Sequence, residues 1–73
     1  MSEISKNKIE YLVVFINKFA RHFSLTDTQA FRYIKRFGGI NFVLQNYGIM
    51  HTLDMDDTNS DMSVFCRKSG GKL

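Results

Sequence analysis

The side chains that could carry acid or base chemistry in this sequence are Tyr47, His51 and Thr52. An imidazole beside a phenol can transfer protons, because imidazole titrates near neutral pH. No nucleophile, base and orienting group are combined around them, and a His just past a helix end commonly satisfies a free carbonyl. Thr52 is placed to cap the following helix. We therefore interpret these residues as structural and expect no catalytic residue and no enzymatic activity.

An acidic run suggests a calcium loop and comprises Asp54, Asp56, Asp57 and Asp61. The glycine that such a loop needs at its sixth position is replaced by Asn59, and the glutamate at its twelfth by Phe65. One Cys and two His are also too few for a closed zinc site. The pairs Gly38-Gly39 and Gly70-Gly71 lack the spacing and the lysine of a phosphate-binding loop. We therefore expect no metal, no cofactor and no small-molecule substrate.

Cys66 is the single cysteine and stands among apolar residues. This setting favours a buried small apolar side chain over a reactive thiol, and a lone Cys excludes an internal disulfide. The longest uninterrupted apolar run, residues 11–16, is far shorter than the ~20 residues that span a bilayer. No small-residue cleavage site follows this run. We therefore expect a cytoplasmic protein without a membrane segment.

The spacing of apolar residues predicts an all-α fold, a compact bundle of about four helices in one domain over residues 1–73. The first helix is expected over about 7–22. Its apolar stripe comprises Ile9, Leu12, Val13, Ile16, Phe19, Ala20 and Phe23, widened by Phe15. An alternative is a strand over residues 11–16, which are rich in β-branched and aromatic side chains. The ends, 1–5 and 69–73, are expected to be frayed.

The second helix, about 27–37, has both of its end signals in the sequence. Thr26 and Gln29 form a capping box, and the glycines at positions 38 and 39 close the helix and force a tight corner. The predicted core face carries Ala30, Phe31, Ile34 and Phe37.

Two further helices are expected after the corner, a shorter one over about 40–47 and another over 55–68. The third carries Ile40, Val43, Leu44 and Tyr47 on one face, and the fourth carries Met55, Met62, Phe65 and Cys66. Thr52 or Asp54 is expected to cap the fourth helix. Its early residues are poor helix formers, so a soft beginning is predicted.

Several short motifs resemble a family of short bacterial proteins known only as a domain of unknown function. They are the Phe37-Gly38-Gly39-Ile40-Asn41-Phe42 corner, Tyr47 with His51-Thr52, and Phe65-Cys66-Arg67-Lys68 followed by Gly70-Gly71. The resemblance covers about residues 11–71. It implies a gene neighbour that looks like an ADP-ribosyltransferase, and hence a toxin–antitoxin or similar pairing. Where relatives tend to carry aliphatic residues in the last helix, this chain has Thr58, Asn59 and Ser63, so this helix is expected either to pack less tightly or to meet a different partner.

A protein-binding role is the first hypothesis for function. The 73 residues include seven Phe, three Tyr and four Met, more apolar surface than so short a chain easily encloses. A chain of this size typically has no more than about 3–5 kcal/mol of net stability, so a homo-oligomer or a complex with a neighbour-encoded protein is expected. The candidate interface residues are Phe42, Tyr47, Ile49, Met50 and His51. Phe42 lies off the core face of the third helix, and the alternative is that the last helix covers it.

DNA binding through a helix-turn-helix is the alternative hypothesis. Residues 1–53 hold seven Lys or Arg against three acids, a balance of +4, whereas residues 54–73 hold three against four, a balance of −1. The candidate phosphate contacts on the first two helices are Lys18, Arg21, Arg32, Lys35 and Arg36. The recognition helix, 40–47, has no Lys or Arg and offers only Asn41, Gln45 and Asn46 to base edges, which weakens this reading.

Overall fold

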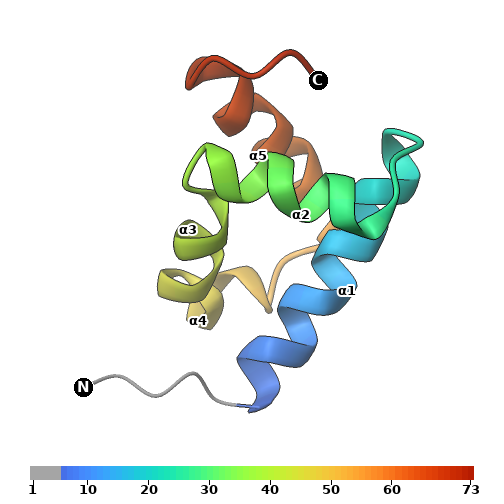
Figure 1. Ribbon diagram of the computed structural model, residues 1–73. Helices are drawn as coiled ribbons and strands as arrows, with labels where there is room; N and C mark the ends of the chain where they lie inside the picture. The colour runs from blue at the N-terminus through green and yellow to red at the C-terminus, as the bar shows by residue number, and fades with distance from the viewer. Residues whose placement is uncertain (1–5) are drawn as a thin grey trace.

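The computed structural model describes residues 6–73, which contain five helices joined by short connections (Figure 1). They are α1 (Lys6–His22), α2 (Asp27–Arg36), α3 (Gly39–Gln45), α4 (Tyr47–Met50) and α5 (Met55–Lys68). No strand occurs in this part of the chain, so the all-α prediction is confirmed and the strand alternative for residues 11–16 is wrong. The predicted third helix is shorter than expected and is followed by the single turn of α4. The expected fraying of residues 1–5 lies outside the described residues.

The core lies where α1, α2, α3 and α5 meet. Each of α2, α3 and α5 contacts α1, and α3 also contacts α2 and α5. In Figure 1, α2 crosses the carboxyl-terminal half of α1, and α5 lies behind α2. The largest fully buried side chains come from all four helices: Phe15, Phe19, Ile34, Val43, Met62 and Cys66.

The buried face of α1 differs from the predicted stripe. Phe15 and Phe19 are fully buried, whereas Ile9 and Val13, both predicted as core, are 48% and 51% exposed. The side covered by the other helices is thus centred closer to Phe15. Much of Ile9 and Val13 stays in water, because α2, α3 and α5 pack mainly against the face of α1 that carries Phe15 and Phe19.

The capping box of α2 is present as predicted. The Gln29 amide donates to Thr26 Oγ1 at 3.1 Å, and the Thr26 amide donates to Gln29 Oε1 at 2.9 Å. Ala30 and Ile34 are buried, but Phe31, expected in the core, is 38% exposed. Phe31 lies beside Val13 and Ile16 at the outer edge of the contact between α1 and α2.

The glycine corner brings α2, α3 and α5 into close approach. Gly38 has a φ of 80°, a left-handed conformation that favours glycine. A Cβ on Gly39 would lie 2.5 Å from Ile34 Cγ2 and 2.7 Å from Met62 Sδ. The absence of a side chain at Gly39 therefore lets α3 begin directly against α2 and α5.

Helix α5 begins and ends at the predicted residues. Asp54 Oδ1 accepts from the Asp56 amide at 2.8 Å and caps the helix, whereas the Thr52 hydroxyl donates back to the Ile49 carbonyl at 2.7 Å. Asp54 is therefore the cap, and the capping role expected of Thr52 is wrong. The buried face also includes Thr58, Asn59 and Ser63, which the predicted apolar face did not contain.

The tail after α5 is held in place, where fraying of residues 69–73 was expected. The Gly71 amide donates to the Cys66 carbonyl at 2.8 Å, and the Leu73 amide donates to the Tyr33 hydroxyl at 3.1 Å. A Cβ on Gly71 would collide with that hydroxyl. The tail therefore packs on α2 through Tyr33.

Candidate functional site

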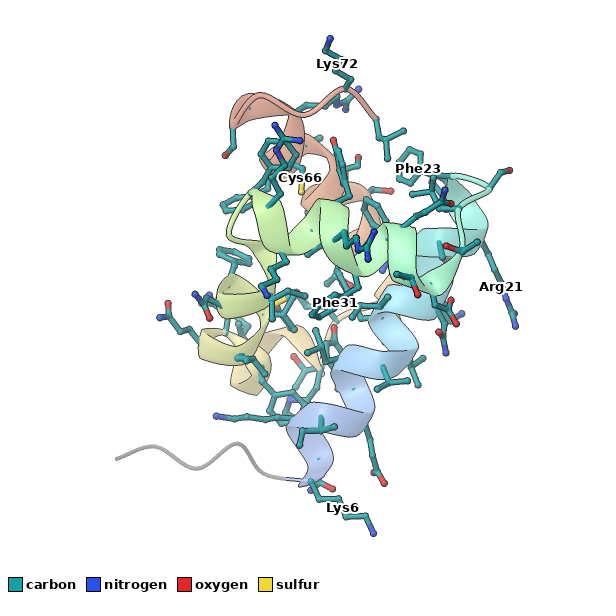
Figure 2. The ribbon with its side chains drawn as sticks, viewed as in Figure 1. Lys6, Arg21, Phe23, Phe31, Cys66 and Lys72 are labelled. Atoms are coloured by element: carbon teal, nitrogen blue, oxygen red, sulfur yellow. The ribbon has the colours of Figure 1, made fainter. Side chains whose placement is uncertain are left out.

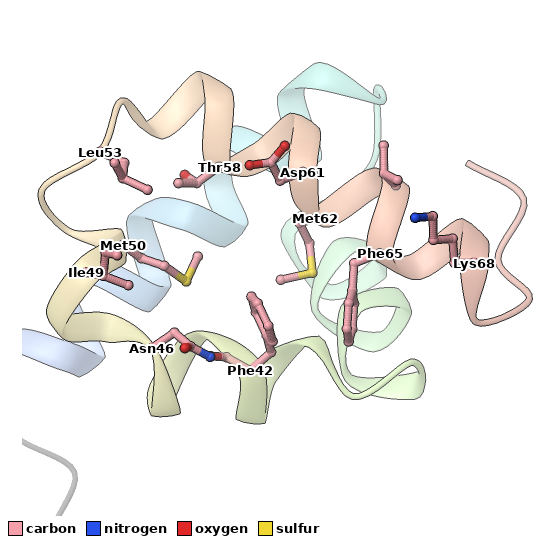
Figure 3. Close-up of a pocket in the computed structure, with 11 residues that line it drawn as sticks. Phe42, Asn46, Ile49, Met50, Leu53, Thr58, Asp61, Met62, Phe65 and Lys68 are labelled. Carbon is pink, nitrogen blue, oxygen red and sulfur yellow. The ribbon is translucent and has the colours of Figure 1, made fainter.

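An apolar groove of about 390 Å³ runs between α5 and the segment formed by α3 and α4 (Figure 3). Four of its lining residues are large apolar side chains that are 39–63% exposed: Phe42, Ile49, Leu53 and Val64. Met50, Met62 and Phe65 are buried or half-buried and form the rest of its apolar surface. The groove therefore gathers half of the eight exposed large apolar side chains of residues 6–73.

The sequence left open whether Phe42 is exposed or covered by the last helix, and the structure shows it partly covered. Its ring contacts the Phe65 ring, with centroids 5.0 Å apart and planes 32° apart, so α5 covers one side of it. The side chain is still 40% exposed and lines the groove from α3. In Figure 3, Phe42 rises from the lower helix towards Met62 and Phe65 on α5. Phe42 is therefore both a packing residue and part of an accessible surface.

Charged and polar groups lie at the edges of the groove. Asp61 and Lys68 line it from α5, both exposed, with Phe65 between them along the helix. Asn46 lines it from the end of α3, where its Nδ2 donates to the Phe42 carbonyl at 2.8 Å. The groove thus has an apolar floor, with one carboxylate and one ammonium on the α5 side.

The structure brings three of the five predicted interface residues into the groove and places two elsewhere. Phe42, Ile49 and Met50 line it, whereas Tyr47 and His51 do not. The rings of Tyr47 and His51 stack with centroids 4.6 Å apart, and His51 Nδ1 donates to the Tyr47 carbonyl at 2.8 Å. His51 thus satisfies a carbonyl at the end of α4, which is the structural role expected for it.

The residues that sequence reasoning missed are Leu53 and Val64. Leu53 is 51% exposed in the segment between α4 and α5, and Val64 is 39% exposed on α5. Helical spacing could have predicted that Val64 is exposed, because it lies off the face of α5 that carries Met62 and Cys66. For Leu53, which belongs to no helix, the sequence contains no comparable signal.

Cys66 does not have the surroundings of a reactive thiol. Cys66 is fully buried, and burial raises the pKa of its thiol above the ordinary value of 9.0, which disfavours the nucleophilic thiolate. Within residues 6–73, no cluster of three or more His, Cys, Asp or Glu side chains could hold a metal ion. The groove itself is lined by apolar residues together with Asp61, Lys68, Asn46 and Thr58.

The five basic residues of the DNA-binding alternative fall into different parts of the surface. Lys18 and Arg21 share a hollow with residues from the start of α5, among them Asp56. Arg32 and Arg36 line a second hollow with the tail. Lys35 lies over the Phe31 ring, with Nζ 5.8 Å from its centroid.

The recognition helix of that alternative is the seven-residue α3. Asn41 and Gln45 are exposed on it, whereas the Asn46 amide is engaged with a backbone carbonyl. Helix α3 thus offers two of the three expected side chains to base edges.

No helix within residues 6–73 has the length and apolar character needed to cross a bilayer. The sequence profile of a family described as "Protein of unknown function (DUF3791)" matches residues 10–69. We found no match to the chain among curated proteins or among solved structures.

Proposed function

The chain belongs to the DUF3791 family of proteins of unknown function, and we propose that it acts as a small non-enzymatic protein-binding module. Its docking surface is the groove between α5 and the α3–α4 segment. The observation that carries the proposal is the concentration of Phe42, Ile49, Leu53 and Val64 along one groove. Contiguous exposed apolar surface with a polar edge is typical of protein-interaction sites.

The composition of the groove supports a protein ligand. Its apolar floor and its two charged edge residues, Asp61 and Lys68, match the core and rim of an interface. Phe42 and Phe65 supply aromatic surface near the middle, and aromatic residues commonly contribute most to binding energy.

The family resemblance adds a candidate for one partner. An ADP-ribosyltransferase-like protein encoded beside the gene would be restrained or regulated by this module, as an antitoxin restrains a toxin. Binding would occur in the cytoplasm, as the sequence predicts, of a bacterium, as the family resemblance implies.

The first prediction concerns contact through the groove in the cell. A photo-crosslinking amino acid in place of Ile49, which is 63% exposed in the groove, is expected to form a covalent adduct with a protein partner in the native cell. The same amino acid at Val14, which is 45% exposed on α1 outside the groove, is the matched control and is expected to give less of this adduct. Mass spectrometry of the adduct identifies the partner as a second copy or as another protein.

Phe42→Asp is expected to abolish the Ile49 adduct, because it places a carboxylate in the apolar floor. Circular dichroism separates the two roles of Phe42: a helical spectrum like that of the wild type shows that binding alone is lost. If the variant unfolds, Leu53→Asp takes its place, because Leu53 lies outside the helices. The absence of any protein adduct from position 49 would contradict the proposal.

A further inference from the structure

We propose that the occupant of the groove is a second copy of this chain, bound so that the two α5 helices run antiparallel. This inference rests on the proposed function, because it names the partner of the same surface. The observation behind it is a self-complementary pattern of charged and apolar residues on the exposed side of α5. That pattern comprises Asp61, Val64, Phe65 and Lys68.

The spacing of these residues places them on one side of the helix. Asp61, Val64 and Lys68 are separated by three and then four residues, the spacing of a helix–helix contact seam. Asp61 and Lys68 are therefore two turns apart, about 10 Å along the axis, with Val64 and Phe65 midway between them. The apolar centre thus has a negative charge, Asp61, on one side and a positive charge, Lys68, on the other.

Antiparallel pairing satisfies both charges at once. A two-fold axis between Val64 and Phe65 places Asp61 of one copy opposite Lys68 of the other, and the symmetric contact is formed at the same time. A parallel arrangement would instead place each Asp61 against its equivalent, where like charges repel. The single pattern therefore selects both the partner and its direction.

Both charged groups are available for such a contact. Asp61 and Lys68 are exposed, and neither has an ion-pair partner among residues 6–73. At the centre, Val64 is 39% exposed, and the neighbouring Phe42 is 40% exposed beside Phe65. Pairing would remove this apolar surface from water, while the ion pairs at the edge fix the register.

The small size of the chain favours this occupant. A domain of 73 residues buries a modest fraction of its surface, and oligomerisation is a usual source of additional stability at this size. An unrelated partner would have to provide its own complementary charges, whereas a second copy already provides them in the required order.

The test is a charge exchange followed by sedimentation equilibrium of the purified chain at low salt. Wild type is expected to be a dimer. Asp61→Lys alone and Lys68→Asp alone each replace two attractive contacts per dimer by two repulsive ones, and each is expected to raise the dimer Kd by about tenfold or more. The double variant, Asp61→Lys with Lys68→Asp, restores attraction in both contacts and is expected to return to the wild-type Kd.

Mixing the two single variants gives a stricter result. In a pair made of one Asp61→Lys chain and one Lys68→Asp chain, both contacts are attractive again, so a 1:1 heterodimer is expected although neither variant dimerises well alone. Arg67→Asp is the control, because Arg67 is also a cation at the end of α5 but does not line the groove. Its dimer Kd is expected to rise less than that of Lys68→Asp.

Two outcomes would overturn the inference. One is a wild-type chain that stays monomeric at about 1 mM, where even weak pairs form. The other is a dimer that neither single charge variant weakens. If the chain is monomeric but Ile49 still forms an adduct with a different protein, the proposed function stands and only the second copy is excluded as partner.

Discussion

Asn59 is the described residue whose environment fits its chemistry least well. It is 5% exposed on α5, and neither its Oδ1 nor its Nδ2 has a hydrogen-bond partner among residues 6–73. Burying an unpaired polar group typically costs about 1–3 kcal/mol. Its neighbours Thr58 and Ser63 avoid this cost, because their hydroxyl groups donate to the Met55 and Ser60 carbonyls at 2.9 and 2.8 Å. Among the three buried polar residues of α5, Asn59 is thus the one whose side chain lacks a hydrogen-bond partner within residues 6–73.

Asn59→Leu is expected to raise the free energy of unfolding by about 1–2 kcal/mol, because leucine has nearly the same branched shape and no unpaired polar atoms. Urea denaturation followed by circular dichroism measures the change. The control is Asn41→Leu on the exposed side of α3, which is expected to change stability by less than about 0.5 kcal/mol. A loss of stability in Asn59→Leu would show that the amide is satisfied in solution.

At the scale of the element, α1 and α5 end in the same hydrogen-bond pattern with different residues. After α1, the Leu25 amide donates to the Ala20 carbonyl at 2.7 Å, and Ser24 takes a left-handed φ of 57°. After α5, the corresponding left-handed residue is Gly70, with a φ of 111°. Glycine is favoured at this position because a Cβ makes the conformation unfavourable. The backbone at the end of α1 is therefore strained at Ser24, whereas the end of α5 avoids this strain because Gly70 has no Cβ.

Ser24→Gly is expected to raise the free energy of unfolding by about 0.5–1 kcal/mol, since relief of the left-handed strain exceeds the entropy that glycine adds to the unfolded chain. Chemical denaturation at one protein concentration measures it. Ser69→Gly is the matched control, because Ser69 also follows a helix but has a φ of −91°. That variant should gain nothing; an equal gain in both would rule out strain at Ser24 as the cause.

At the scale of the whole molecule, the exposed apolar groove links stability to association. If the groove is covered by a second copy, folding and pairing share the same buried surface, and mass action makes the folded state depend on protein concentration. A chain of 73 residues has a small free energy of unfolding, so the part that pairing would add is a large share of it.

The melting temperature of the wild type is therefore expected to rise with protein concentration over a range of about a hundredfold, whereas that of Phe42→Asp is expected to stay constant. Differential scanning calorimetry measures both. A wild-type melting temperature independent of concentration would count against pairing through the groove.

The sequence predicts the helices better than it predicts their buried faces. Asp54 and Lys68 mark the start and end of α5 locally, and Thr26 with Gln29 marks the start of α2, because these caps depend on residues two or three apart. The side of α1 that is covered depends instead on α2, α3 and α5, which is why Ile9 and Val13 were assigned to the core incorrectly.

The groove is even harder to predict from local sequence patterns than the buried faces are. It requires Phe42 and Phe65, 23 positions apart in the chain, to meet while both leave surface in water. Spacing within one helix shows that Phe42 is off the core face, but it contains no information on which segment lies opposite. Three of the five predicted candidates, Phe42, Ile49 and Met50, line the groove, whereas the residues opposite them on α5 were not predicted.

The uncovered side of α1 has a consequence for what a pair of chains would display. Val13 and Phe31 lie together at the contact between α1 and α2, one turn from Ile9, and share no residue with the groove. Two copies joined through α5 would each leave this second apolar surface exposed to solvent, so the pair would present it twice. If that surface binds a target, a pair of chains would hold a target with two such sites more tightly than one chain does, without any new contact.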